Sequence, residues 1–276
     1  CVGIMDNYFP NSDFFVEFER FDRHIDKLKR QGTKIDYVSI CTPNYLHDSH
    51  IRFALRQGAD AICEKPIVLN PWNIDALQEI EKETGRKVNT VLQLRLHPAI
   101  IELKKKIEEG PKDKIYDIDL TYITSRGRWY DISWKGDIQK SGGVATNIGV
   151  HFFDMLTWIF GEVKDNMVHL SEPSKAAGYL ELKNARVRWF LSVDYNDVPN
   201  EIKAKNQRTF RSISIEGKEI EFSEGFTDLH TDTYKQIIEG KGFGLDEAKQ
   251  SIQIVYTIRN SQVLGLKGNF HPFCNK

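Results

Sequence analysis

The chain has 276 residues, of which 40% are hydrophobic, and its 38 Lys and Arg residues nearly balance 39 Asp and Glu residues to leave a formal net charge of -1. This length accommodates two domains with ample cores, and the balanced charge argues against nucleic acid or an anionic membrane surface as the main partner. No apolar run reaches the roughly 18 residues that a membrane-spanning helix needs, and no signal peptide is visible.

The first third of the chain alternates between amphipathic helices and apolar strands. The first predicted helix ends near Gly32, and its apolar side chains recur at helical spacing at Phe14, Phe18, Phe21, Ile25 and Leu28. A buried strand follows at residues 35–41, then a turn at 42–44 and a helix that stops at Gly58.

The next elements repeat this order. Residues 59–63 form a strand that Pro66 terminates, because proline cannot donate to a sheet ladder and fixes its own backbone angle. A helix runs from the Asn70–Pro71 pair to Gly85, and a strand is predicted over 88–94. Strands and helices that alternate at this spacing predict an α/β fold with a parallel, doubly wound sheet of the Rossmann type.

The pattern changes near Pro98. Residues 100–107 predict a helix, and residues 116–122 alternate between apolar and polar side chains, which is typical of an antiparallel strand with one solvated face. The remaining predicted elements are helices at 148–160, 229–238 and 246–258 and strands at 179–182, 187–193, 209–215 and 220–222. We therefore expect two domains, a parallel α/β domain over residues 1–97 and an α+β domain with a mostly antiparallel open sheet over residues 98–276.

The four cysteines, Cys1, Cys41, Cys63 and Cys274, show no C-x-x-C spacing. Two of them lie inside apolar runs that resemble strands, so reduced thiols in the core are a better interpretation than a metal site. Reduced cysteines indicate a cytoplasmic location.

Lys65 lies directly after the strand at 59–63, between Glu64 and Pro66. It is therefore presented at the carboxyl end of a strand, which is where ligands bind in open α/β sheets. Partial burial there lowers the pKa of an amine and suits it to proton transfer. A surface lysine that merely ends a strand is the competing interpretation from position alone.

A glycine-rich stretch at residues 142–154 carries the second candidate group. Asn147, His151 and Asp154 are spaced to share one helical face, and the glycines of this stretch allow backbone to approach a ligand closely. His151 is a candidate general base because the pKa of histidine lies near neutral pH. A structural histidine is the alternative, and a metal site with Asp154 lacks an evident third ligand.

Two further groups follow strands at the same sheet edge. Thr42, Pro43 and Asn44 open a helix whose first backbone N–H groups could receive a phosphate or ribose, although ordinary helix capping by Asn44 explains them equally well. Gln93 and Arg95 follow the next strand, and Arg95 could hold a carboxylate or phosphate bidentately.

A basic and aromatic loop precedes the glycines. Its residues suit an anionic ligand that bears a ring, and a solvated loop is the alternative. They are Arg126, Arg128, Trp129, Tyr130, Trp134 and Lys135.

Together these residues resemble the glucose–fructose oxidoreductase, inositol dehydrogenase and rhizopine-catabolism (Gfo/Idh/MocA) family of NAD(P)-dependent sugar oxidoreductases, over residues 36–160. Each motif alone is weak, but their combination is specific: Thr42-Pro43-Asn44 with His47, Glu64-Lys65-Pro66, and Gly142-Gly143 with Gly149, His151 and Asp154. A closer likeness to family members that act on nucleotide-linked sugar acids lies in Tyr45–Asp48, Asn70–Asn73, Gln93–Pro98 and His271–Phe273.

The resemblance implies a role for each candidate residue. Lys65 and His151 would be catalytic, with His151 accepting the proton of a sugar hydroxyl. The cofactor would be lined by Thr42, Pro43, Asn44, His47, Glu64, Lys65 and Gln93. The substrate would be met by Arg95, Arg126, Trp134, Lys135, Asn147 and His151, without a metal ion.

The resemblance also implies a reaction and its partners. The expected function is NAD-dependent oxidation of the C3 hydroxyl of UDP-N-acetylglucosaminuronate to the 3-keto sugar, in bacterial O-antigen synthesis, by a homotetramer that can pass electrons to 2-oxoglutarate. Use of NADP in place of NAD is left open. An oxidoreductase of the same family that acts on another sugar or an inositol is one alternative, and a non-catalytic nucleotide-sugar-binding protein is another.

The chain departs from the family pattern at two places. Many members have an aspartate where this chain has Asn147, and an asparagine cannot share a proton with His151. No G-x-G-x-x-G occurs before Lys65, although this turn supplies the pyrophosphate site, so we expect that about forty residues of the family pattern precede Cys1 in the complete protein.

Overall fold

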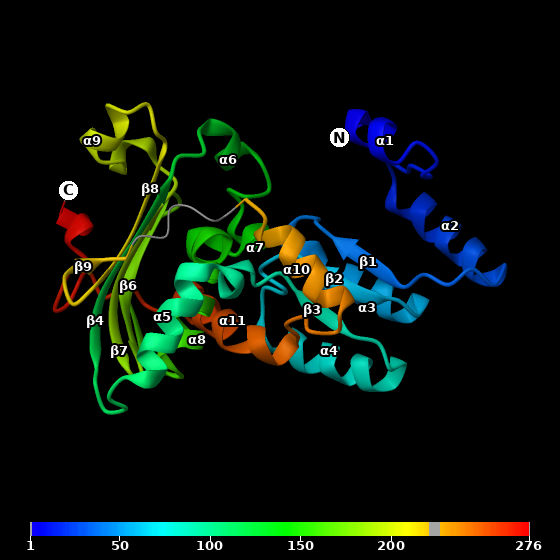
Figure 1. Ribbon diagram of the computed structural model, residues 1–276. Coiled ribbons are helices and arrows are strands. Elements are labelled where there is room, and N and C mark those ends of the chain that lie inside the picture. The colour runs from blue at the N-terminus through cyan, green and yellow to red at the C-terminus, as the bar shows by residue number, and fades with distance from the viewer. Residues whose placement is uncertain (1, 221–226, 276) are drawn as a thin grey trace.

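The computed structural model describes residues 2–220 and 227–275, which form two β-sheets and the helices that cover them (Figure 1). The smaller sheet has three strands and the larger has six. The predicted fold class, a parallel α/β part followed by an α+β part with a mostly antiparallel sheet, is confirmed.

The small sheet is parallel throughout, in the order β1 (Tyr37–Ile40), β2 (Asp60–Cys63) and β3 (Val88–Thr90). The crossover helices are α3 (His47–Gln57) and α4 (Pro71–Thr84), and both pack buried aliphatic side chains into the core. Parallel neighbours require such crossovers, so all three strands end at the same edge.

Glycines end both crossover helices as predicted. Gly58 and Gly85 have φ angles of 84° and 67°, a left-handed conformation that a side chain with a Cβ atom disfavours. Each glycine therefore lets the chain reverse from helix into the next strand.

The strand predicted over residues 88–94 is shorter than expected. It ends at Thr90, whose N–H donates to Phe243 O at 2.8 Å, and the chain then forms the short helix η2 (Gln93–Leu96). The apolar run continues because these residues are buried, although they have left the sheet.

The large sheet has the strand order β5-β6-β7-β4-β8-β9, and only the pair β4–β7 is parallel. Its strands are β4 (Tyr116–Thr124), β5 (Val163–Ser171), β6 (Lys175–Leu182), β7 (Ala185–Ser192), β8 (Thr209–Ile215) and β9 (Lys218–Glu219).

Two edge strands differ from the prediction. β5 was not predicted, because two register shifts and several exposed polar side chains break its alternation. The strand predicted at 220–222 is not found at Ile220, which follows β9, and residues 221–222 lie outside the described residues.

Helices α5 (Pro98–Glu109), α8 (Val150–Phe160) and α11 (Leu245–Asn260) lie between the large sheet and the small one, as Figure 1 shows. The opposite face of the large sheet carries α9 (Asn200–Lys203) and the C-terminal segment with η5 (Pro272–Asn275).

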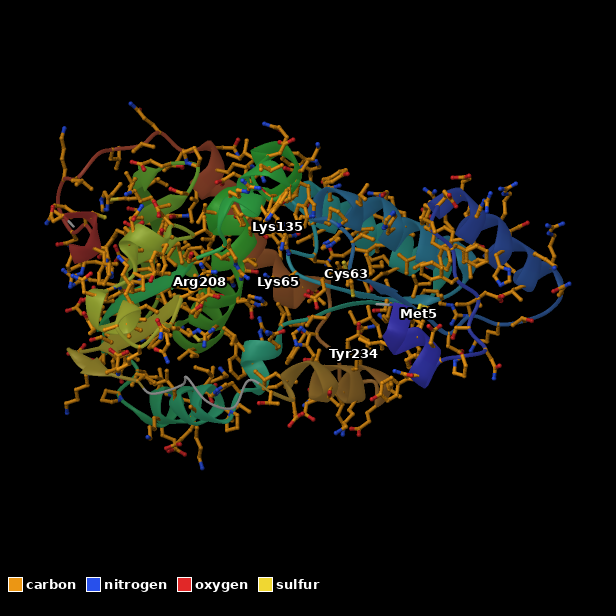
Figure 2. All side chains as sticks on the ribbon, turned by 90° about the horizontal axis from the view of Figure 1, so that it is seen from above. Met5, Cys63, Lys65, Lys135, Arg208 and Tyr234 are labelled. Atoms are coloured by element: carbon orange, nitrogen blue, oxygen red, sulfur yellow. The ribbon has the colours of Figure 1, made fainter. Side chains whose placement is uncertain are left out.

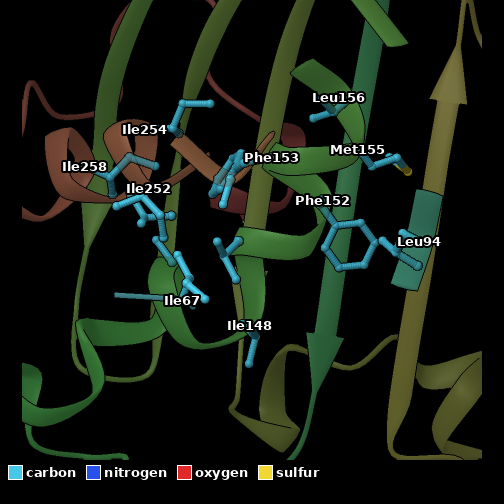
Figure 3. Close-up of a cluster of buried hydrophobic side chains, with 14 of the residues drawn as sticks. Ile67, Leu94, Ile148, Phe152, Phe153, Met155, Leu156, Ile252, Ile254 and Ile258 are labelled. Atoms are coloured by element: carbon cyan, nitrogen blue, oxygen red, sulfur yellow. The ribbon is translucent and has the colours of Figure 1, made fainter. Parts of the chain in front are cut away.

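The main core is one cluster that joins both sheets. Figure 3 shows its centre, where Phe152, Phe153, Met155 and Leu156 of α8 lie among side chains of α11 and η2. Burying one such side chain contributes roughly 1.5–3 kcal/mol, so the position of α8 between the sheets is strongly fixed.

The remaining elements are short or peripheral. They are α1 (Val2–Tyr8), α2 (Phe18–Arg30), η1 (Asn44–Leu46), α6 (Arg128–Ile132), α7 (Ile138–Ser141), the π-helix η3 (Ala145–Gly149), η4 (Tyr195–Asp197) and α10 (Leu229–Ile238). α10 lies against η2, so a segment far along the chain returns to the carboxyl edge of the small sheet.

The cysteines match the prediction only in part. Cys63 is a buried free thiol, Cys274 is half-buried, and Cys41 is exposed because it follows β1 instead of lying within it; Cys1 lies outside the described residues. Within residues 2–220 and 227–275 no helix has the length and apolar character to cross a bilayer, and no three His, Cys, Asp or Glu side chains of this part gather as metal ligands.

Candidate active site

A cavity of about 270 Å³ lies where the carboxyl edge of the small sheet meets α8 and the large sheet. Figure 2 shows Lys65 near the middle of the molecule, between Cys63 of the small sheet and Arg208 next to the large sheet. The cavity is lined by Glu64, Lys65, Gln93, Leu94, Tyr122, Arg126, Ile148, His151, Phe152, Arg211 and His230.

Lys65 lies two residues after Cys63, the last residue of β2, and its peptide bond to Pro66 is cis. Its Nζ donates to the main-chain oxygen of Asn147 at 2.9 Å. Burial lowers the pKa of Lys65 from 10.5 to about 8; the carboxylate of Glu64 opposes this change, whereas Arg126 and Lys135 add to it. The amine is thus able to exchange a proton near neutral pH.

His151 lies in the first turn of α8 and faces the same cavity. Burial lowers the pKa of His151 well below 6.5, and the positive charges of Lys65, His230 and Arg211 lower it further. Its Nδ1 is buried and has no hydrogen-bond partner within the described part of the chain. The imidazole is therefore neutral at pH 7 and able to accept a proton.

Asn147, His151 and Asp154, which the helical spacing places on one face, contact three different parts of the structure. Asn147 lies in the π-helix η3, whose wider turn changes the register ahead of α8. The side chain of Asn147 donates to Tyr130 Oη at 2.9 Å, while His151 faces the cavity and Asp154 is buried in the core.

Arg95 does not line the cavity either. Its Nε and Nη2 donate to the two oxygens of Asp154 at 3.0 and 2.7 Å, and Nη2 also donates to Glu247 O at 3.0 Å. Arg95 and Asp154 are 7% and 1% exposed, and the guanidinium lies over the Trp158 ring at 5.7 Å. The expected substrate contact of Arg95 is thus replaced by a buried ion pair.

The predicted cofactor residues fall into two groups. Glu64, Lys65 and Gln93 line the cavity. The others belong to the loop after β1, where Thr42 and Pro43 are half-buried and Asn44 and His47 are buried. Thr42 Oγ1 lies 3.0 Å from His50 Nδ1, and Asn44 donates to Ser141 O at 2.8 Å.

The predicted substrate residues are also divided. Arg126 lines the cavity with His151. Lys135 lies over the ring of Trp134 at 5.6 Å and lines a neighbouring cavity of about 300 Å³ together with Gly142 and Gly143. The effect of Lys135 on the pKa of Lys65 indicates that the two amines are close enough to interact.

Sequence reasoning missed Tyr122, Arg211 and His230, which complete the cavity. Tyr122 and Arg211 are cross-strand partners in β4 and β8, and the guanidinium lies 5.3 Å from the ring centre. The alternation of both strands carried that signal. His230 Nε2 lies 3.2 Å from Glu64 Oε1. No local sequence pattern predicts this contact, because it depends on the packing of α10 against the carboxyl edge of the small sheet.

The cavity combines a neutral histidine, a lysine with a lowered pKa and two arginines. Among the residues that the structure describes, Glu64 is the single acidic one that lines the cavity, and it lies next to His230. An anionic ligand is therefore favoured, and a hydroxyl held between Lys65 and His151 could lose its proton to the imidazole.

Family models match both parts of the chain. Residues 1–91 match the NAD-binding Rossmann fold of the Gfo/Idh/MocA oxidoreductase family, and residues 104–265 match the C-terminal alpha/beta domain of that family.

Solved structures and curated relatives agree with this match. The WlbA (WbpB) dehydrogenase from Thermus thermophilus is 49% identical, with a TM-score of 0.94 over 99% of this chain and 88% of that one, in complexes with NAD and alpha-ketoglutarate and with NAD and UDP-GlcNAcA. Inositol 2-dehydrogenase from Rhizobium meliloti (strain 1021) is 31% identical over 51% of this chain. The matched segment spans 41% of that relative, so the chain covers less than half of its length.

Proposed function

The chain belongs to the Gfo/Idh/MocA oxidoreductase family, and we propose that it oxidises the C3 hydroxyl of UDP-N-acetylglucosaminuronate to the 3-keto sugar, with NAD as cofactor. The observation that carries this proposal is the meeting of Lys65 and His151 in one cavity with Arg126 and Arg211. The likeness to the Thermus thermophilus dehydrogenase, at 49% identity, supports the choice of sugar.

The residues at the cavity fit the nicotinamide end of NAD. Gln93 Oε1 is buried and lacks a hydrogen-bond partner among the described residues, so it could accept a bond from a carboxamide N–H. Glu64 and Lys65 lie beside it at the cavity wall. When bound there, NAD supplies the acceptor for a hydride from the sugar carbon.

The chain's own residues supply the proton chemistry. His151 is neutral and accepts the C3 hydroxyl proton. Lys65, as an ammonium, donates a hydrogen bond to the same oxygen and stabilises the negative charge that develops on it. Arg126 and Arg211 hold the carboxylate or diphosphate of the substrate, which orients the ring between the two catalytic residues.

The proposal divides the chain into a dinucleotide-binding part over residues 1–97 and a part over 98–276 that binds substrate and forms a homotetramer. The outer face of the large sheet supports the assembly, because it bears a polar cavity of about 590 Å³ and an ion pair in which Arg188 donates to both oxygens of Asp119 at 2.6 Å. Such a face can match a copy of itself. The reaction belongs in the cytoplasm, where its nucleotide-sugar substrate is made.

Two assays test the proposal. Purified protein with NAD should convert UDP-N-acetylglucosaminuronate to a product lighter by two hydrogens, and the absorbance of NADH at about 340 nm should bleach when 2-oxoglutarate is added. Equal turnover of UDP-N-acetylglucosamine, whose sugar lacks the carboxylate, would contradict the assignment of a sugar acid.

Two alternatives predict different results. An enzyme of this family that acts on a free sugar or inositol would gain no thermal stability from UDP, because only a bound ligand stabilises the folded state. A non-catalytic nucleotide-sugar-binding protein would be stabilised by UDP but would form no NADH. The Lys65 and His151 pair disfavours the second alternative, since binding alone has no use for a proton acceptor.

The two lowered pKa values predict a bell-shaped pH profile. We expect kcat/KM to rise as His151 loses its proton, at a pH well below 6.5, and to fall through about pH 8 as Lys65 loses its own. Initial rates between about pH 5 and pH 10 measure both limbs. A rate that keeps rising through the alkaline range would mean that Lys65 acts as a neutral amine.

Asn147→Asp is expected to move the alkaline limb upward by about one pH unit. A carboxylate near Lys65 favours the charged amine and raises its pKa, so the amine stays protonated at higher pH. The matched control is Asn147→Ser, which keeps the main-chain oxygen that binds Lys65 and adds no charge. If both variants keep the limb near pH 8, position 147 does not set the acidity of Lys65.

A further inference from the structure

We infer that His47 is a positioning residue that holds Lys65 in place through the carbonyl group of Pro66. The inference deepens the proposed dehydrogenase function and rests on it for the role of Lys65. The resemblance to known sequences placed His47 against the cofactor, but the structure gives it no exposure to any ligand, since His47 is 0% exposed.

His47 is the first residue of α3 and lies between two loops. Its Nδ1 is 2.7 Å from Pro66 O, in the loop after β2, and its Nε2 is 2.8 Å from Thr42 O, in the loop after β1. Both distances are short for a hydrogen bond from nitrogen to oxygen. One buried ring therefore ties together the carboxyl ends of two neighbouring strands.

Both partners of His47 are carbonyl oxygens, so each contact requires an N–H group of the ring. A carbonyl oxygen only accepts hydrogen bonds, whereas a neutral imidazole has a single N–H. Burial lowers the pKa of His47, while the two carbonyl groups and Glu64 favour the charged ring and Lys65 opposes it. His50, from the next turn of α3, also faces His47. Because its pKa is lowered, the ring is neutral at pH 7 and donates its single N–H to one of the two carbonyl groups at a time.

The bridge acts on Lys65 because Pro66 follows it directly in the chain. Lys65 is fixed at its tip by the bond from Nζ to Asn147 O. Proline has no N–H of its own, so its carbonyl group is the main-chain group through which Pro66 is held by a hydrogen bond, on the side of Lys65 opposite to Glu64, whose N–H donates to Ile40 O at 3.0 Å. With both ends fixed, the amine remains in the cavity next to His151.

His47→Leu tests the inference, since leucine fills the site and donates no hydrogen bond. We expect kcat to fall about 100-fold, because misplacing a catalytic group by about 1 Å lowers the rate by about that factor. The KM for NAD should change less than about threefold. His47→Gln keeps an amide group that can donate two hydrogen bonds. On a logarithmic scale, its kcat should recover at least about a third of the loss expected in His47→Leu.

A second readout does not depend on turnover. The pKa of Lys65 can be measured in protein without cofactor, from the pH dependence of its labelling by an amine reagent read by mass spectrometry. Release of Pro66 lets the amine reach water, so the pKa should move from about 8 toward 10.5 in His47→Leu. His50→Leu is the matched control, because His50 Nδ1 lies 3.0 Å from the side-chain oxygen of Thr42 instead of from a main-chain carbonyl group.

The outcomes separate cleanly. Retention of both kcat and the labelling pKa in His47→Leu overturns the inference, and so does an equal shift in His50→Leu. If His47→Leu fails to fold, His47→Met takes its place, because methionine also fills the site and donates no hydrogen bond: a labelling pKa that moves toward 10.5 supports the bridge, and a value that stays at about 8 overturns it. If the wild-type protein proves not to be a dehydrogenase, the labelling result still stands or fails by itself.

Discussion

Replacing Lys65 by alanine is expected to lower kcat by about 10²–10⁴-fold, because a positioned group that handles a proton in the transition state contributes about that much. The affinity for NAD should change less than about threefold. The amine donates to Asn147 O and lines the cavity with His151, so it supplies only a small part of the surface that would bind NAD. Steady-state kinetics give kcat, and quenching of protein fluorescence by NADH gives the dissociation constant.

A second lysine provides the control for this experiment. Lys104 also donates its Nζ to a main-chain oxygen, that of Trp158 at 2.9 Å, but it lies on α5 away from the cavity. Lys104→Ala should leave kcat unchanged. Loss of NAD affinity in Lys65→Ala by the same factor as kcat would remove Lys65 from the catalytic step and make it a binding residue.

Replacing Asp154 by alanine is expected to lower the free energy of unfolding by about 3–5 kcal/mol, because it leaves the guanidinium of Arg95 buried without its counter-charge. The pair joins η2 to α8 through two hydrogen bonds at 3.0 and 2.7 Å. Both residues are almost entirely buried, so water cannot replace the lost carboxylate. Urea denaturation followed by fluorescence measures the change.

The surface offers a matched ion pair. Arg52 and Asp48 of α3 form a pair at 2.8 Å with about a quarter of each side chain exposed, and Asp48→Ala should cost less than about 1 kcal/mol. Replacing Arg95 by Met and Asp154 by Leu together should recover most of the stability, since apolar residues of similar size can substitute for a buried pair. If Asp154→Ala lowers the free energy of unfolding no more than Asp48→Ala does, the buried pair contributes little to stability.

Much of the small sheet could be predicted from local chemistry. Pro66 ends β2 because it cannot donate to the ladder, so Lys65 had to stand at the carboxyl edge. Gly58 and Gly85 end α3 and α4 because each adopts a positive φ angle that glycine favours, so the residue type alone predicts both helix ends. His151 was found because glycines precede it on an apolar helix.

The misses have a common cause, which is contact between segments distant in sequence. Arg95 follows a strand, as a ligand-binding arginine would, but Asp154 lies 59 residues away and captures it. His230 lies next to Glu64 because α10 packs against η2 at the edge of the small sheet. Local sequence patterns do not predict that packing.

The partner of Lys65 is a main-chain oxygen, and this has a consequence for how the protein can evolve. The position of the amine is set by a main-chain oxygen that every amino acid at position 147 retains, whereas the pKa of Lys65 is set by burial and by the charges of Glu64, Arg126 and Lys135. Geometry and acidity are therefore governed by separate groups. A substitution that alters a neighbouring charge is therefore expected to shift the working pH of the protein without removing the main-chain contact that positions the amine.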